Sequence, residues 1–229
     1  MGKRAGRREN TLMQLTQRFG EAPLMHWVAR LYTRIFGWKV VGLENLPDDP
    51  KMIGVLAPHT SNWDVWMMYV MAYEMRITAN WLAKDSLLRP PLGWLLRMLG
   101  AIPIDRSKSN NYVDQVVDVL HSYDNLYLAI APEGTRSKTE RWRSGFYYIA
   151  MKANVRLILM FIDYGTKEVG FGPVVTPTGD IHKDFEAIKA FYADITPRNP
   201  EQRSDMVLRI PARAEQAEAD KAPDVSAKA

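Results

Sequence analysis

Apolar runs of two kinds alternate along the chain, and they predict alternating strands and helices. Short, almost wholly apolar runs predict buried strands, whereas apolar positions recurring every three or four residues predict helices. The predicted strands, some with an adjoining turn or loop, cover residues 38–46, 51–58, 79–84, 101–106, 125–134 and 155–165. The predicted helices cover residues 64–75, 110–123 and 145–153, and a further helix follows the proline pair in residues 86–100. This order predicts an α/β fold, with a mixed, largely parallel sheet covered by helices on both faces.

The N-terminal part has the pattern of an amphipathic helix pair. Apolar residues recur at helical spacing across residues 11–37, with arginines between them, and the stretch from Gly20 to Pro23 divides the run. One interpretation is a pair of helices packed on the core, and the other is a pair lying in a membrane interface. The two interpretations are compatible if one face of the helices packs on the core and another face lies in the membrane interface. We therefore expect interfacial helices at 1–37, the main domain at 38–210, and a disordered, Ala-rich tail at 211–229.

Composition and charge narrow the class of partner. The 229 residues include no cysteine, which excludes disulfides, thiolate metal sites and a covalent thiol mechanism. Residues 1–40 carry eight basic and two acidic side chains, a charge of +6, whereas the whole chain carries only +4. A basic end suits an anionic partner, either nucleic acid or acidic lipid headgroups. No apolar run reaches the roughly 18 residues of a membrane span, and no secretory signal is visible, so we expect a soluble or surface-attached protein.

The stretch "HTSNWD" places His59 and Asp64 directly after a predicted buried strand. Five positions along one helix turn the chain about 500°, so the two side chains cannot meet within a helix. They can meet if His59 lies in the turn before the helix and Asp64 in the first helical turn. Asp64 would then fix the imidazole tautomer and leave the other ring nitrogen free as a base. On spacing alone, a capping aspartate beside an incidental surface histidine remains the alternative.

A second polar stretch, "APEGTRSK", also follows a predicted strand. Gly134 permits close approach of the backbone to a ligand, and Arg136 offers a planar fork for a phosphate or carboxylate. Arg106 ends another strand, and the carboxyl ends of parallel strands meet at one edge of a sheet. There is no G-x-S-x-G elbow, dinucleotide fingerprint or phosphate-binding loop, and the four histidines lack metal-ligand spacing.

Three ordered stretches resemble the glycerolipid acyltransferase superfamily, which includes 1-acylglycerol-3-phosphate acyltransferase. "HTSNWD" resembles its H-x4-D motif, "GAIPIDRS" its G-x-I-x-I-D-R block, and "PEGTRS" its E-G-T-R-S block. The resemblance covers about residues 25–175 and implies an α/β domain preceded by interfacial helices. The sequence departs from the family pattern at two places, and these departures leave the identity of the acceptor headgroup open. Arg156 stands near a position where the family has proline, and "WRSG" at 142–145 replaces F-K-x-G.

The resemblance implies transfer of a fatty acyl chain from acyl-CoA or acyl carrier protein to a lysolipid hydroxyl, with 1-acylglycerol-3-phosphate as the default acceptor. It implies His59 and Asp64 as the catalytic pair. The substrate-binding candidates are Lys84, Arg106, Glu133, Gly134, Thr135 and Arg136. No metal or bound cofactor is expected, because the donor is a co-substrate. The alternatives are a lyso-aminolipid or other lysophospholipid as acceptor, or a hydrolase that uses the same pair.

The expected partners are the lysolipid, the thioester donor and an anionic membrane surface. A nucleic-acid binder would explain the basic end but not the three motif blocks, so no nucleic acid is expected. We expect a peripheral protein of phospholipid biosynthesis at the cytoplasmic face of the inner membrane.

Overall fold

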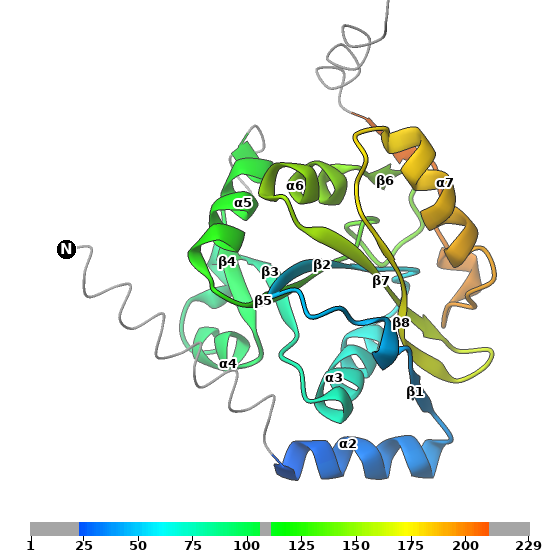
Figure 1. Ribbon diagram of the computed structural model, residues 1–229. Helices are drawn as coiled ribbons and strands as arrows, with labels where there is room; N and C mark the ends of the chain where they lie inside the picture. The colour runs from blue at the N-terminus through cyan, green and yellow to red at the C-terminus, as the bar shows by residue number, and fades with distance from the viewer. Residues whose placement is uncertain (1–22, 106–110, 211–229) are drawn as a thin grey trace, which may run out of the picture.

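A seven-stranded sheet organises the protein (Figure 1). The computed structural model describes residues 23–105 and 111–210. The strands of the sheet are β1 (Lys39–Val41), β2 (Lys51–Leu56), β3 (Asn80–Lys84), β4 (Ala101–Ile104), β5 (Leu126–Ile130), β7 (Arg156–Asp163) and β8 (Glu168–Val175). Two further strands, β6 (Trp142–Arg143) and β9 (Leu208–Arg209), form a separate parallel pair.

The strand order is β1-β8-β7-β2-β5-β3-β4. Strands β7, β2, β5, β3 and β4 are parallel to one another, whereas β8 runs antiparallel to β7 and pairs in parallel with β1. The mixed, largely parallel sheet expected from the sequence is therefore confirmed. Because β2 lies between β5 and β7, the residues that follow these three strands meet at one edge of the sheet.

Helices cover both faces of the sheet, as expected. The helices are α2 (Pro23–Phe36), α3 (Trp63–Met75), α4 (Gly93–Met98), α5 (Tyr112–Ser122), α6 (Gly145–Ala153) and α7 (Ile181–Tyr192). In Figure 1, α5, α6 and α7 lie on one side of the sheet, and α3 and α4 on the other, with α2 beyond α3. Each side has its own buried apolar cluster, which explains why the strands are apolar on both faces.

The helix predicted after the proline pair in residues 86–100 is present as α4. A short 3-10 helix, η2 (Asp85–Leu88), is separated from α4 by Pro90 and Pro91. Proline has no backbone N–H and restricts the residue before it, so no helix runs through the pair. Strand β8 and helix α7 are present in the structure but were not predicted from the sequence.

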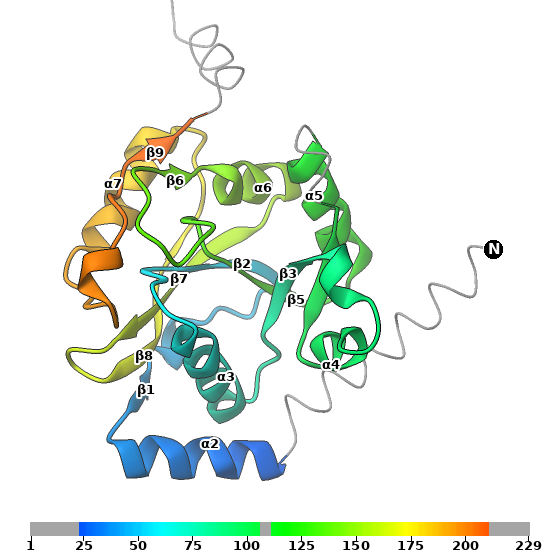
Figure 2. The same ribbon diagram turned by 180° about the vertical axis from the view of Figure 1, so that it is seen from behind.

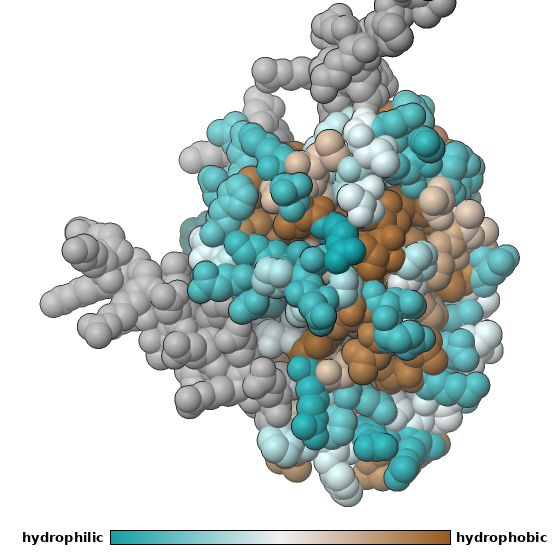
Figure 3. Space-filling model, viewed as in Figure 1, coloured by the Kyte–Doolittle hydropathy of each residue, from teal (hydrophilic) through white to brown (hydrophobic). Residues whose placement is uncertain are grey.

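Helix α2 packs on α3 through a narrow side and leaves its apolar stripe exposed. Ala29 and Thr33 are buried, and the Thr33 hydroxyl donates to Glu74 of α3 (3.0 Å). The exposed apolar residues, 39–68% accessible, are Leu24, Trp27, Val28, Leu31, Ile35 and Phe36. In Figure 3, brown apolar side chains reach the lower edge of the molecule, where Figure 1 places α2.

The rest of the predicted N-terminal helix pair and the predicted tail lie outside the described residues. Within residues 23–105 and 111–210, no helix has the length and apolar character needed to cross a membrane.

Candidate active site

His59 lies in the short connection between β2 and α3. The side chain of Asp64, the second residue of α3, points back toward it, with Asp64 Oδ2 3.1 Å from His59 Nδ1. Asn62 is the N-cap residue of α3 and forms no side-chain cap. The predicted arrangement, with His59 in the turn and Asp64 in the first helical turn, is therefore what the structure contains.

Four hydrogen bonds hold the carboxylate of Asp64, whose exposed fraction is 1%. Its Oδ2 accepts from the backbone N–H groups of Thr60 and Ser61, both at 2.9 Å, as well as from His59. Its Oδ1 accepts from the Tyr164 hydroxyl at 2.8 Å. Burial, followed by the charge of Asp64, raises the pKa of Tyr164 above its usual range. Tyr164 therefore remains a neutral donor, and the buried charge is satisfied.

The imidazole of His59 is held in one tautomer. Asp64 can only accept, so Nδ1 carries the proton of this hydrogen bond and Nε2 carries the lone pair. The His59 side chain is 14% exposed, and no residue in the described part of the chain hydrogen-bonds to Nε2. Nε2 is thus placed to take a proton from a substrate.

Glu133 anchors the main chain of His59. It comes from the loop after β5, the strand next to β2, and its Oε2 accepts from the His59 backbone N–H at 2.7 Å. Glu133 is 2% exposed, and its Oε1 has no hydrogen-bond partner among the described residues. Burial raises the pKa of Glu133 to about 7, against the opposing effect of the His59 N–H. Glu133, a substrate-binding candidate from the sequence, therefore contacts the connection that carries His59 and orders it.

Four of the remaining candidates lie at this edge of the sheet, and none of the four hydrogen-bonds to His59 or Asp64. Gly134 has φ +68°, and an added Cβ would lie 3.0 Å from the Arg143 guanidine, so glycine suits the turn. Thr135 and Arg136 are exposed, as is Lys84 at the end of β3. Arg106 lies outside the described residues.

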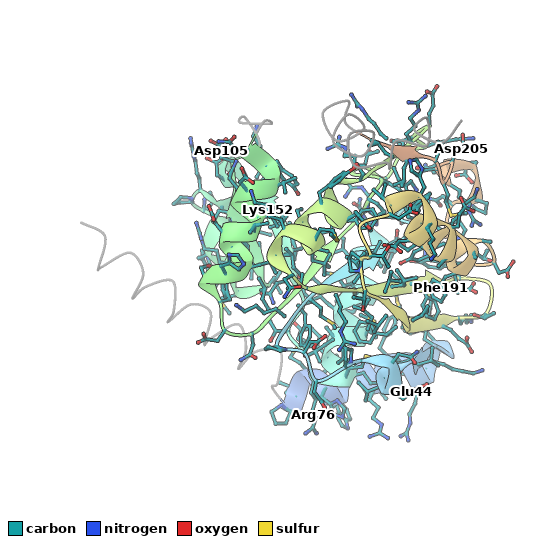
Figure 4. The ribbon with its side chains drawn as sticks, turned by 45° about the horizontal axis from the view of Figure 1, so that its top comes forward. Glu44, Arg76, Asp105, Lys152, Phe191 and Asp205 are labelled. Atoms are coloured by element: carbon teal, nitrogen blue, oxygen red, sulfur yellow. The ribbon has the colours of Figure 1, made fainter. Side chains whose placement is uncertain are left out.

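The edge of the sheet at the carboxyl ends of the parallel strands and the edge at their amino ends lie on opposite sides of the molecule. Figure 4 shows Asp105, just beyond β4, and Asp205 on one side, and it shows Glu44 and Arg76 on the other. Glu44 and Arg76 precede β2 and β3, at the edge away from His59.

The two sequence departures have structural roles. Arg156 begins β7, at the opposite end of that strand from Tyr164, and its Nε lies 2.5 Å from Asp49 Oδ2. An ion pair therefore holds Arg156 at the end of β7 that lies away from the His59–Asp64 pair. Trp142 of "WRSG" is 1% exposed, with its ring centroid 5.7 Å from that of Tyr192, so it builds the core, whereas Arg143 is exposed beside Gly134.

A segment after α7 completes the site, and the sequence reading missed it. The Asn199 side-chain amide donates to the Thr60 carbonyl at 2.8 Å. The Gln202 amide, in the orientation that satisfies its hydrogen bonds, donates to the carbonyls of Thr60 and Arg136, both at 2.8 Å. Figure 2 shows this part of the chain passing from α7 to β9, beside β6.

The sequence could have indicated Tyr164 as a site residue, because it follows an apolar strand as His59 does. No pattern in the sequence around Asn199 indicates that this segment belongs to the site.

The acyltransferase family model matches residues 37–163, more than half of the chain. The protein therefore belongs to the acyltransferase family, as the three motif blocks indicated. The chain is 25% identical to the chloroplastic 1-acyl-sn-glycerol-3-phosphate acyltransferase of Arabidopsis thaliana over 165 residues, 67% of this chain and 43% of the relative. It is 31% identical to the 1-acyl-sn-glycerol-3-phosphate acyltransferase of Pseudomonas aeruginosa over 114 residues, 48% of this chain and 41% of the relative.

These matches leave much of each relative uncovered, since the chain spans about two fifths of the length of the curated relatives it matches. The fold is similar to that of a solved structure, the 1-acyl-sn-glycerophosphate acyltransferase PlsC of Thermotoga maritima, with a TM-score of 0.52. That similarity covers 85% of this chain and 83% of the other at 22% identity. It supports the α/β fold described above.

Proposed function

We propose that the protein is an O-acyltransferase that moves a fatty acyl chain from a thioester to the hydroxyl of 1-acylglycerol-3-phosphate. The observation that carries the proposal is the His59–Asp64 pair, with Nδ1 held at 3.1 Å and Nε2 left open. The curated relatives are named for this acceptor, which supports its choice.

The proposed chemistry is direct transfer. His59 Nε2 takes the proton of the acceptor hydroxyl, and the alkoxide oxygen attacks the thioester carbonyl carbon. The tetrahedral intermediate collapses with cleavage of the C–S bond, and the departing thiolate takes the proton from the imidazolium. Asp64 stabilises that imidazolium during the reaction. A thiol with a pKa of about 8–9 leaves readily, so the step needs no metal and no bound cofactor.

Cationic and backbone groups around the pair are the proposed substrate ligands. Arg136 and Lys84 are exposed cations at the same sheet edge and suit the acceptor phosphate or the phosphates of acyl-CoA or acyl carrier protein. Arg106 is proposed for the same role from its position after the strand. Gly134 and Thr135 offer a close backbone approach and a hydroxyl.

We also propose that the enzyme is a peripheral protein on an anionic membrane. Helix α2 supports this, because its exposed apolar stripe is flanked by the exposed side chains of Arg30 and Arg34. An amphipathic helix with arginines beside its apolar face suits a lipid–water boundary. The family resemblance supports a place in phospholipid biosynthesis, at the cytoplasmic face of the inner membrane.

The test is a product assay with the purified full chain. Radiolabelled acyl-CoA or acyl carrier protein thioester is incubated with vesicles that contain one lysolipid from a panel, and the lipid products are separated. We expect label in the diacyl product of 1-acylglycerol-3-phosphate and none with a His59→Ala variant. Label only in free fatty acid would identify a hydrolase, and label only in an aminolipid product would replace the acceptor.

A further inference from the structure

An arginine from the segment after α7 stands between two aromatic rings beside the catalytic pair. The Cζ atom of Arg198 lies 5.2 Å from the ring centroid of Trp63 and 5.6 Å from that of Tyr164. Tyr164 is the residue whose hydroxyl donates to Asp64. Arg198 is thus separated from the Asp64 carboxylate by one side chain.

Arg198 is exposed and forms no ion pair with any carboxylate in the described part of the chain. An aromatic ring within about 6 Å of a guanidinium attracts the cation, and two such rings order its long side chain. A guanidinium has five N–H donors, so contact with two rings leaves donors for the oxygens of an anion. The geometry therefore provides a pre-ordered cation next to His59.

Exposed aromatic rings connect this cation to α2. Trp63 and Trp66 lie one turn apart on α3, and they are 51% and 43% exposed. The Trp66 ring meets the Tyr32 ring of α2 edge-on, with centroids 5.8 Å apart. Tryptophan side chains suit a lipid–water boundary, being apolar in the ring and polar at the N–H.

We propose that Arg198, held by Trp63 and Tyr164, binds the phosphate of a lipid headgroup that reaches His59 from the side of α2 and α3. The inference rests on the proposed function, because it assigns the position from which the acceptor arrives. The thioester donor also has phosphates, but it comes from water. The line of aromatic rings from α2 to Arg198 favours the lipid as the occupant.

The experiment measures binding of a short-chain, monomeric 1-acylglycerol-3-phosphate to the full chain by calorimetry. Arg198→Gln is compared with Lys189→Gln, which removes one charge from an exposed position on α7. A hydrogen-bonded charge pair contributes enough that we expect roughly tenfold or more weaker binding for Arg198→Gln. Lys189→Gln should bind like the wild type, and the matching uncharged monoacylglycerol should not distinguish Arg198→Gln from wild type.

A second variant, Trp63→Leu, keeps an apolar side chain but removes the ring below the guanidinium. It should weaken binding in the same direction and by less. Unchanged lipid binding by Arg198→Gln would overturn the proposal, and so would a loss of acyl-CoA binding with lipid binding intact. If Arg198→Gln loses the phosphate lipid but the wild type transfers no acyl chain, the proposed function fails while the binding site stands.

Discussion

His59 is positioned through both its side chain and its main chain. Asp64 holds the ring at Nδ1, and Glu133 holds the backbone N–H at 2.7 Å. Asp64 is in turn held by the N–H groups of the turn before α3 and by Tyr164. A base must present its lone pair in one direction, and this network supplies that direction before substrate binds.

Removal of either member of the pair should abolish most of the activity. We expect His59→Ala to lower kcat by at least about 100-fold, the lower range for a general base. Asp64→Asn should be almost as damaging, since a neutral amide cannot stabilise the imidazolium that forms on His59. Steady-state kinetics measure both effects, and circular dichroism checks the fold. Near-wild-type turnover in a folded His59→Ala protein would exclude this base.

Glu133 should make stability depend on pH. A buried glutamate whose pKa rises from 4.5 to about 7 binds its proton more tightly in the folded state. Stability from this group is therefore greatest below pH 4.5 and falls as pH rises to about 7, by roughly 3 kcal/mol. Glu133→Gln keeps an acceptor for the His59 N–H and removes the titration. The free energy of unfolding of Glu133→Gln relative to wild type should thus increase between pH 4.5 and 7.

Urea unfolding of both proteins at several pH values measures this difference, since other titrating groups cancel in it. A matched control, Glu133→Ala, also removes the titration but loses the acceptor, so it should be less stable than Glu133→Gln at every pH. A stability difference that stays constant across this range would show that the Glu133 carboxyl titrates elsewhere.

At the scale of elements, the regular apolar strands and the amphipathic helices were predictable from their spacing. The prediction ended near β7, because β8 contains Gly170, Gly172 and Pro173, which weaken a strand pattern. Helix α7 was predictable from its apolar spacing, but the sequence analysis did not assign it. Ile181, Phe185, Ile188 and Tyr192 recur at helical spacing and are all buried.

The site was predictable in part for the same reason. His59, Asp64 and Glu133 follow strands, so the sheet itself brings them to one edge. Asn199 and Gln202 reach Thr60 through tertiary packing across about 140 residues. No local pattern of residues reports a contact of that kind.

The exposed stripe of α2 should carry membrane binding. Trp27→Glu or Ile35→Glu places a charge where apolar side chains are 61% and 66% exposed. Loss of one such side chain from lipid should weaken binding to anionic vesicles about tenfold or more. Co-sedimentation with vesicles measures this change, and raising the salt should weaken the part of binding that Arg30 and Arg34 provide.

Met151→Glu is the matched control, since Met151 is a 42% exposed apolar residue on α6, on the other side of the sheet. It should bind vesicles like the wild type. If Trp27→Glu and Ile35→Glu also sediment undiminished, the membrane contact lies elsewhere in the protein.

At the scale of the whole molecule, the residues that match the acyltransferase family model do not include all of the elements that form the folded domain. Residues 37–163 lack β8, which pairs with β7, and α7, whose Ile188 and Tyr192 are fully buried. A fragment of residues 37–163 should therefore show no cooperative thermal transition, whereas a fragment of residues 23–210 should show one. Calorimetry distinguishes them, and a sharp transition in the shorter fragment would contradict the role given to α7.

The central place of β2 also has a consequence for biosynthesis. Its partner in β7 lies about a hundred residues later in the chain, as the pairing of Met52 with Arg156 shows. At about 5–20 residues per second, a ribosome takes roughly 5–20 seconds to make that stretch. Helix α2 has by then emerged with its apolar stripe uncovered. If α2 docks as proposed, the nascent chain is already tethered to the membrane when β7 arrives and the sheet closes.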